Sequence, residues 1–374
     1  MYWIYGAFYI SIVVALLFKS RIVFVNHNNR VIGHNEKRNN VVLMAMYAIP
    51  LMFVAACRYE FIDTSDYRNM YQIIGPSINN ALKGAVQRVE KGYLLFTALL
   101  NYISTDSQFL FIISSIIIIG CFCHFISCEA TRENITFCLI SFSTSLWIST
   151  MNGLRQILVA AVICLLWMKW SKMQYSLRNS IPFIIAIVIL SSIHLSILIC
   201  IPIFAITRGK LFNKAIGIAF LITTLMLAFS PLYEWFFLSL LRNTSYSSMI
   251  NTETKMGIPR LILRSIPMVF IILYKVTGRD RTEKNYRLVW MLNMSVLSFL
   301  FSILSLRMVY FSRVRIYFNI FSIVSLPLLI DRCFNKNTAK VIKVLLCIFY
   351  ILLFHYQNNA YGQEITEFKL FFEA

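Results

Sequence analysis

The sequence predicts an all-α polytopic membrane protein, and two observations carry that prediction. Hydrophobic residues fill 59% of the 374 positions, the mean hydropathy is +0.70 and only 14% of residues are charged. This composition excludes an ordinary soluble globular domain. The apolar residues also fall in long runs separated by short basic loops. Because no internal repeat, low-complexity tract or linker divides these runs, we expect a single transmembrane domain over residues 1–374.

The apolar runs predict about ten membrane spans. A spanning helix needs roughly 17–25 apolar residues. We interpret the first run as a retained span rather than a signal peptide, since a second long run follows its basic loop. The segment Gly92–Ser104 is too short to cross and begins in a polar loop, so we expect a helix at the interface. The expected spans are Tyr2–Phe18, Val41–Cys57, Phe109–Cys128, Ile135–Thr150, Leu154–Met168, Ala215–Tyr233, Arg264–Val276, Leu288–Leu306, Ile316–Ile330 and Val344–Tyr356.

The basic residues of the first loop set the expected orientation. Cytoplasmic loops carry an excess of Lys and Arg, and this loop contains Lys19, Arg21, Arg30, Lys37 and Arg38. The N-terminus is therefore predicted outside. A large loop, residues 58–107, and a second outer loop, residues 234–263, follow on the outer side.

The segment 181–206 decides the orientation of everything after it. Its length corresponds to about 39 Å of helix, which fits one tilted span or two short half-helices turning around residues 191–194. With a re-entrant hairpin, 21 of the 35 Lys and Arg residues lie inside, whereas a single span would move the later basic loops outside. We therefore favour the hairpin. Irregular backbone at membrane depth is tolerated where it lines a cavity or is packed in protein, so we expect His194 near a cavity floor.

Charge and cysteines exclude two common classes of function. The net charge of +19 resides largely in the short loops between apolar runs, so it indicates topology and an anionic ligand rather than nucleic acid. The nine cysteines lie in or beside apolar runs and form no CxxC pair. We interpret them as small buried side chains.

The longest polar interruption, Arg58–Tyr93, mixes cations, carboxylates and tyrosines on the predicted outer side. The predicted topology brings further polar residues to the same side. Arginine suits a phosphate ligand, because its planar guanidinium makes paired charge-assisted bonds. Ionisable groups at membrane depth are functional candidates by default. The gathered residues are Arg58, Asp66, Glu90, Arg155, Gln156, His194, Arg307, Arg313 and Arg315.

The sequence contains no paired DxD carboxylates, glycine-rich phosphate loop, HExxH motif or Cys/His metal-ligand spacing. A nucleotide-sugar donor held by a metal is therefore disfavoured, and we expect no metal and no cofactor. A lipid-linked diphosphate donor stays open, since arginines alone can stabilise a departing diphosphate.

Five short motifs occur in the order seen in one family. They are Arg58 followed by Asp66-Tyr67, Glu90-Lys91-Gly92-Tyr93, Asn152-Gly153-Leu154-Arg155-Gln156 with Ala160, His194-Leu195-Ser196-Ile197, and Arg307 ahead of Arg315-Ile316-Tyr317-Phe318. In this the chain resembles the EpsG/Wzy-type bacterial polysaccharide polymerases. The resemblance covers most of the sequence.

The resemblance implies a glycosyltransferase C-like helical architecture in the bacterial cytoplasmic (inner) membrane, with the active site facing outward. It implies polymerisation of undecaprenyl-diphosphate-linked oligosaccharide repeat units into O-antigen or a similar surface polysaccharide. The implied partners are a lipid-linked donor and acceptor, membrane lipids and a chain-length regulator protein.

The residue types suggest roles within that reaction. Arg58, Arg155, Arg307, Arg313 and Arg315 would hold the donor diphosphate and stabilise it as the leaving group. Asp66, Glu90 or His194 would accept the proton of the acceptor hydroxyl. Substrate contacts are further expected from Gln156, Tyr67, Tyr71 and Tyr93, whose rings can face sugars.

Structural roles are the alternative for each of these residues. Arg58 and Arg307 could anchor at lipid headgroups, Asp66 and Glu90 could pair with Arg68 and Arg88, and His194 could bond a backbone carbonyl. The tyrosines could belong to an interfacial belt. Two other functions also stay open, a transporter or flippase of lipid-linked oligosaccharide and a polysaccharide ligase.

Overall fold

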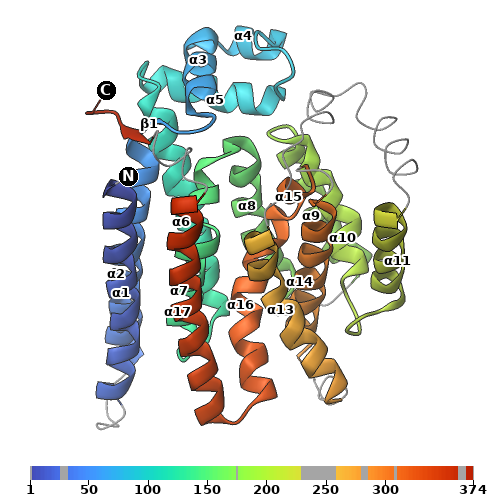
Figure 1. Cartoon of the computed structure of the whole chain (residues 1–374). Coiled ribbons are helices and arrows are strands. Elements are labelled where there is room, and N and C mark those ends of the chain that lie inside the picture. Colours follow the sequence, from blue (N-terminus) through green and yellow to red (C-terminus); the bar gives the residue numbers. More distant parts are fainter. Residues whose placement is uncertain are drawn as a thin grey trace. The chain divides into compact units, whose positions relative to one another are not determined.

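The computed structural model describes residues 2–25, 33–173, 176–228, 258–278, 285–306, 310–360 and 368–373, and most of them are helical (Figure 1). Four helices are long and apolar enough to cross a membrane, and shorter apolar helices lie in between. An all-α membrane architecture therefore agrees with the sequence, while the number of spans stays a prediction. The four are α6 (Gln108–Glu129), α14 (Tyr286–Leu304), α16 (Ile316–Cys333) and the stretch Lys336–Asn358 of α17 (Lys336–Ala360).

The chain divides into two compact units. Unit 1 comprises residues 1–195 and 341–374, and unit 2 comprises residues 196–340. Unit 1 contains α1 (Tyr2–Val25), α2 (Gly33–Cys57), β1 (Arg58–Glu60), α3 (Thr64–Ile74), α4 (Ile78–Lys83), α5 (Lys91–Ile103), α6, α7 (Ile135–Ser145), η1 (Ile148–Met151), α8 (Leu154–Trp170), α9 (Leu177–Ser191), most of α17 and β2 (Lys369–Leu370).

The helices of unit 1 pack side by side. Helix α2 packs on α1 and α6, α6 packs on α8, and α8 packs on α9. Helix α17 closes on α1 through stacked rings, with Phe354 4.2 Å from Phe8 between ring centroids. Buried aromatic pairs of this kind add to the packing attraction that holds helices together in an apolar solvent.

One expected span is interrupted. The run 135–150 is divided into α7 and the short η1, rather than forming one helix. The hydroxyls of Thr144 and Ser145 donate back to the carbonyls of Ile140 and Ser141 at 2.9 and 2.6 Å. Such side-chain bonds compete with the regular helical ladder, and α7 ends at Ser145.

Helices α3, α4 and α5 lie together at the end of unit 1 where α2 ends and α6 begins (Figure 1), which we call the loop end. In α3, the buried residues Tyr67, Met70, Tyr71 and Ile74 recur at helical spacing and form one apolar face. Helix α5 packs against α3. Its Asn101 donates to the carbonyl of Tyr71 at 2.8 Å, which fixes the two helices to each other.

A short antiparallel sheet brings the end of the chain to the loop end. Strand β2 pairs with β1, and the N–H of Phe371 donates to the carbonyl of Cys57 at 2.9 Å. Lys369 forms an ion pair with Glu60 at 2.8 Å, and the ring of Phe368 packs on Phe61. The last residues therefore hold the backbone that carries Arg58.

The segment 181–206 is broken where the sequence indicates. Helix α9 ends at Ser191, residues 192–194 form a turn, and the short η2 (Leu195–Ile199) and α10 (Cys200–Ile206) follow. The carbonyl of Ser192 accepts a hydrogen bond from Gly92 at the start of α5, so the turn lies at the loop end. That this segment is a re-entrant hairpin stays a prediction.

Unit 2 contains α10, α11 (Lys214–Ala228), α13 (Ile258–Val276), α14, α15 (Tyr310–Val314) and α16. Helices α13, α14 and α16 pack on one another, and the buried hydroxyls of Ser295 and Ser325 meet at 3.2 Å between α14 and α16. Buried Asn293 donates to the carbonyls of Thr207 and Lys210 at 2.8 and 3.1 Å. This amide fixes the turn before α11 on α14.

The pairing of β2 with β1 predicts a stability difference between neighbouring positions. Leu370 is fully buried, whereas Phe371 is about half exposed. We expect Leu370→Ala to lower the free energy of unfolding by about 2 kcal/mol or more, because a buried Leu truncated to Ala leaves a cavity. Phe371→Ala should change it by less than about 0.5 kcal/mol. Denaturant titration of the purified protein in detergent measures both; equal losses would contradict the strand pairing.

Candidate active site

Arg68 on α3 holds the framework of the loop end. Its guanidinium donates to the carbonyl of Arg58 and to the hydroxyl of Ser107, both at 3.0 Å, and also contacts the side-chain oxygen of Gln108. It lies over the ring of Tyr59, 4.5 Å from the centroid. These contacts tie β1, α3 and the start of α6 together. Arg68 therefore has a structural role through these contacts and does not pair with Asp66.

Arg58 is buried, with 1% of its surface exposed. One nitrogen donates to the carbonyl of Ala55, and the guanidinium lies 4.5 Å from the centre of the Phe111 ring. Its Nε and Nη2 make no hydrogen bond to any of the residues that the structure describes. Burial lowers the pKa of Arg58 to about 10, opposed chiefly by the charge of Asp63, so the group stays cationic at neutral pH. A buried cation with open donors is suited to an anion.

Asp63 connects this arginine to the start of α8. Its carboxylate accepts the N–H of Gly153 at 2.7 Å. Gly153 has φ +66°, a left-handed conformation that strongly favours glycine, and α8 begins at the next residue. The sequence Asn152-Gly153 is therefore explained by a turn that places Arg155 in the first turn of α8.

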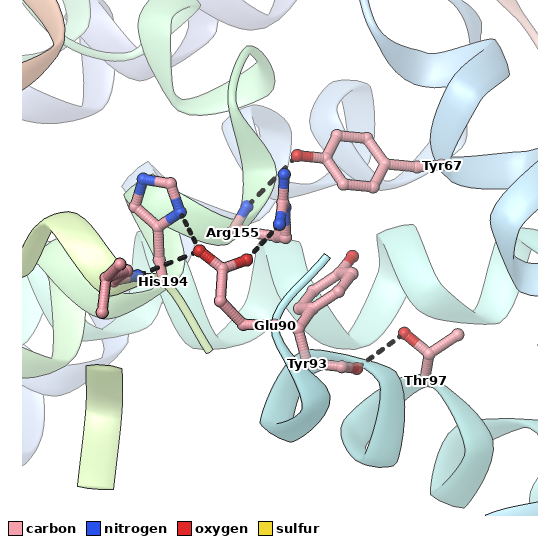
Figure 2. A network of polar contacts seen from close by, with 7 residues as sticks. Tyr67, Glu90, Tyr93, Thr97, Arg155 and His194 are labelled. Carbon is pink, nitrogen blue, oxygen red and sulfur yellow. Dashed lines mark hydrogen bonds and ion pairs between the residues drawn. The ribbon is translucent and has the colours of Figure 1, made fainter. Parts of the chain in front are cut away.

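Arg155, Glu90 and His194 meet at the loop end (Figure 2). A guanidinium nitrogen of Arg155 donates to one carboxylate oxygen of Glu90. The other oxygen accepts the N–H of Leu195 at 3.0 Å and lies 3.3 Å from Nδ1 of His194, in a geometry not well aligned for a hydrogen bond. His194 is buried, whereas Arg155 and Glu90 keep about a fifth of their side chains exposed.

The partners of Glu90 fix its charge state. Burial alone would raise the pKa of the carboxyl, but the contact with His194, the charge of Arg155 and the Leu195 N–H together lower it to about 2. Glu90 is therefore an ionised carboxylate at neutral pH. It joins residues from the start of α5, the start of α8 and the turn after α9.

Gly92 allows α5 to approach that turn. The N–H groups of Gly92 and Tyr93 donate to the carbonyl of Ser192 at 2.8 and 3.2 Å. A Cβ at Gly92 would meet the Ser192 hydroxyl at 2.1 Å and its carbonyl oxygen at 2.7 Å, both far inside contact distance. Glycine is needed here for space and not for a special backbone angle.

Tyrosines line the same cluster. The ring of Tyr67 packs edge-on against Tyr93 at 6.0 Å, and the Tyr67 hydroxyl lies 3.5 Å from the backbone nitrogen of Arg155 (Figure 2). The guanidinium of Arg155 lies 5.9 Å from the centre of the Tyr93 ring. Tyr93 is fully buried, and its hydroxyl has no hydrogen-bond partner among the described residues. Tyr71 is buried between α3 and α5 and donates to Ser104 at 2.7 Å.

The structure thus brings together five of the residues that the sequence analysis singled out in unit 1: Arg58, Tyr67, Glu90, Tyr93, Arg155, with His194 in contact with Glu90. Gln156 is buried on α8 beside Arg155 in the chain. Asp66 is exposed on α3, and its side chain makes no hydrogen bond or ion pair within the described part of the chain.

Three arginines of the sequence prediction lie elsewhere in the chain. Arg307 falls outside the described residues. Arg313 on α15 is half-buried, and Arg315, at the start of α16, is buried, both within unit 2. Their part in a shared site stays a prediction.

Asp63 was not among the site residues predicted from the sequence, although its negative charge favours the cationic form of Arg58. Asp63 stands three residues before Asp66, and the spacing of the sequence does not show which of the two aspartates belongs to the site. The structural signal is that Asp63 directly precedes α3 without capping it, so its carboxylate is available to Gly153. Within the described residues, no group of three or more His, Cys, Asp or Glu side chains could hold a metal ion.

Helices long and apolar enough to cross a membrane, with a cluster of two arginines, a carboxylate and an imidazole at the loop end, indicate an all-α membrane protein with a polar cluster in unit 1. The comparison with family models is specific: the EpsG family matches residues 41–370. The chain therefore belongs to the EpsG family, and the resemblance seen in its motifs is confirmed. No curated protein and no solved structure matches significantly.

The contact between Asp63 and Gly153 predicts unequal effects of two neighbouring carboxylates on stability. Asp63→Ala leaves a backbone N–H unpaired and removes the negative charge beside buried Arg58. We expect it to lower the free energy of unfolding by about 1–3 kcal/mol. Asp66→Ala, at an exposed position of the same helix, should have a clearly smaller effect. Thermal unfolding in detergent compares them, and a larger loss for Asp66→Ala would refute this placement of Asp63.

Proposed function

We propose that this protein is a glycosyltransferase that polymerises undecaprenyl-diphosphate-linked oligosaccharide repeat units into a surface polysaccharide at the outer face of the bacterial cytoplasmic membrane. Membership of the EpsG family indicates a polysaccharide polymerase role. The single observation that carries the finer proposal is the arginine pair of unit 1, because Arg58 and Arg155 both lie in a polar cluster at the loop end.

The chemistry of the cluster supports a diphosphate ligand. Arg58 is cationic, buried and has two nitrogens without a hydrogen-bond partner among the described residues. Arg155 donates to Glu90 through one nitrogen and also interacts with the Tyr67 side chain, and a guanidinium carries five N–H donors in all. Two such groups can stabilise the charge that develops on a departing diphosphate, in a water-poor site where each bond is stronger than in water.

The sheet at the end of the chain supports the proposed topology. Pairing of β2 with β1 places residues 369–370 at the loop end with residues 58–60. If residues 58–60 and residues 369–370 lie on the same side of a membrane, the segment between them must cross that membrane an even number of times. The eight spans expected between residues 109 and 356 meet that condition when 181–206 is a hairpin, and a further crossing there would break it. Because the basic residues of the first loop predict that loop in the cytoplasm, the loop end would be the outer end.

The remaining parts of the proposal rest on the family resemblance. Arg307, Arg313 and Arg315 would contribute to holding the donor, and Gln156 and the tyrosines Tyr67, Tyr71 and Tyr93 to holding sugars. The implied partners are the lipid-linked donor and acceptor, membrane lipids and a chain-length regulator protein.

Chain growth by the purified protein tests this function. The protein is reconstituted in nanodiscs with a synthetic polyprenyl-diphosphate-linked repeat unit and no added metal. We expect a ladder of lipid-linked products that differ by one repeat. Single units transferred to another acceptor would indicate a ligase, movement between leaflets without new bonds would indicate a flippase, and either result would overturn the proposal.

Lysine substitution of the two clustered arginines should abolish that ladder. Arg58→Lys and Arg155→Lys keep the positive charge but lose the planar paired donors, so we expect polymer formation to fall by about 10²-fold or more. Arg88 is an exposed arginine of the same loop and provides the matched control, Arg88→Lys. Initial rates of ladder formation measure the effect. Rates within twofold of wild type for both clustered variants would refute the diphosphate role.

A further inference from the structure

Glu90 stands at the N-cap position of α5, but its side chain does not cap the helix. The first N–H groups of α5 donate instead to the carbonyl of Ser192, which comes from the turn after α9. Side chains of Ser, Thr, Asp or Asn at this position commonly accept from the orphan N–H groups of their own helix, and a negative charge is favoured there by the helix dipole. Here a backbone carbonyl replaces the carboxylate, and the carboxylate of Glu90 is directed to other partners.

Those partners surround the carboxylate on both oxygens. One oxygen accepts from Arg155, and the other accepts from the N–H of Leu195 and faces Nδ1 of His194. The contact with Leu195 fixes Glu90 to the same turn that carries His194. The carboxylate thus has little capacity left for a substrate hydroxyl, although it can orient the imidazole.

The imidazole presents its other nitrogen away from Glu90. In Figure 2, Nδ1 of His194 points to the carboxylate and the second ring nitrogen points to the opposite side. A carboxylate at Nδ1 favours the tautomer that carries its proton there, which leaves Nε2 as the basic nitrogen. Among the described residues, the charged and titratable groups that share the cluster with His194 are Glu90 before α5, Tyr93 on α5, Arg155 on α8, Tyr67 on α3, Asp63 before α3 and Arg58 on β1.

We propose that His194 is the catalytic base of the transfer reaction and that Glu90 is its positioning residue, held in place because Gly92 lets α5 contact the Ser192 turn. This inference rests on the proposed function. Nε2 accepts the proton of the acceptor hydroxyl while that oxygen bonds to the anomeric carbon of the donor glycan. The bond from that carbon to the diphosphate breaks, and the lipid diphosphate leaves with the electron pair.

The ionisation of Glu90 agrees with this division of roles. A carboxyl whose pKa lies at about 2 holds its proton too weakly to be an efficient base near neutral pH. Asp66, the third candidate base from the sequence, is exposed and has no contact with His194 or Arg155 among the described residues.

The test is the pH profile of polymer formation by the reconstituted protein. His194→Gln should lower the maximal rate by roughly 10²-fold or more, the usual contribution of a positioned base. Glu90→Gln should retain a measurable rate, with the acidic limb of its profile moved to lower pH, because the imidazolium form loses a negative neighbour and Arg155 stays positive. A structural role alone would lower the rate without moving that limb.

Gly92→Ala tests the positioning contact. We expect the maximal rate to fall by about tenfold or more while the KM for the acceptor stays within about threefold, since the change displaces the Glu90 junction. Ser192→Gly in the same chain removes the clashing side chain and should restore part of the rate. Gly6→Ala, a helical glycine with no atom within 4 Å of the added Cβ, is the matched control and should behave as wild type.

The outcomes separate the inference from the function beneath it. A wild-type protein that forms no polymer at any pH overturns both. A polymerising wild type whose His194→Gln variant keeps more than a third of its rate, or whose Glu90→Gln variant keeps an unmoved acidic limb, overturns the inference alone. If Gly92→Ala does not fold, the His194 and Glu90 profiles still decide it.

Discussion

The carboxylate of Glu90 is the interaction on which the loop end of unit 1 depends. It joins the start of α5, the start of α8 and the turn after α9, three elements that are far apart in the sequence. Each partner alone would stabilise the Glu90 carboxylate only modestly. Together they leave both oxygens of a partly buried charge satisfied, which is the condition for keeping an ionised group away from water.

Arg58 and Asp63 form a second group of polar contacts at the loop end. Asp63 fixes the left-handed turn at Gly153 and balances part of the charge of Arg58, while Arg68 binds the backbone of β1 from the other side. The C-terminal strand completes this support. Arg58 is consequently held by its backbone, and its side chain keeps two nitrogens without hydrogen bonds to the described residues. A buried guanidinium whose backbone is held by its neighbours, and which keeps unused N–H donors, is suited to an anionic ligand.

Much of the helical structure could be predicted from the hydrophobic pattern of the sequence. The apolar runs predicted the helices, and the expected helix at Gly92–Ser104 agrees closely with α5 at Lys91–Ile103. The motifs also marked Arg58, Glu90, Arg155 and His194 as belonging together. Spacing could not show that Asp63 rather than Asp66 is the partner of Arg58, because that depends on Asp63 preceding α3 while Asp66 lies on the exposed side of that helix. It also could not show that Gly92 makes room for Ser192, a contact between segments a hundred residues apart.

Binding of a lipid diphosphate by Arg58 and Arg155 at the loop end, as proposed, is tested most directly by a binding measurement. Isothermal titration of the purified protein with a short-chain polyprenyl diphosphate, and with the corresponding monophosphate, compares the two ligands under identical detergent and salt conditions. The account predicts saturable binding with a clear preference for the diphosphate, lost in Arg58→Lys. Equal affinity for the two ligands, or unchanged diphosphate binding in that variant, would contradict it.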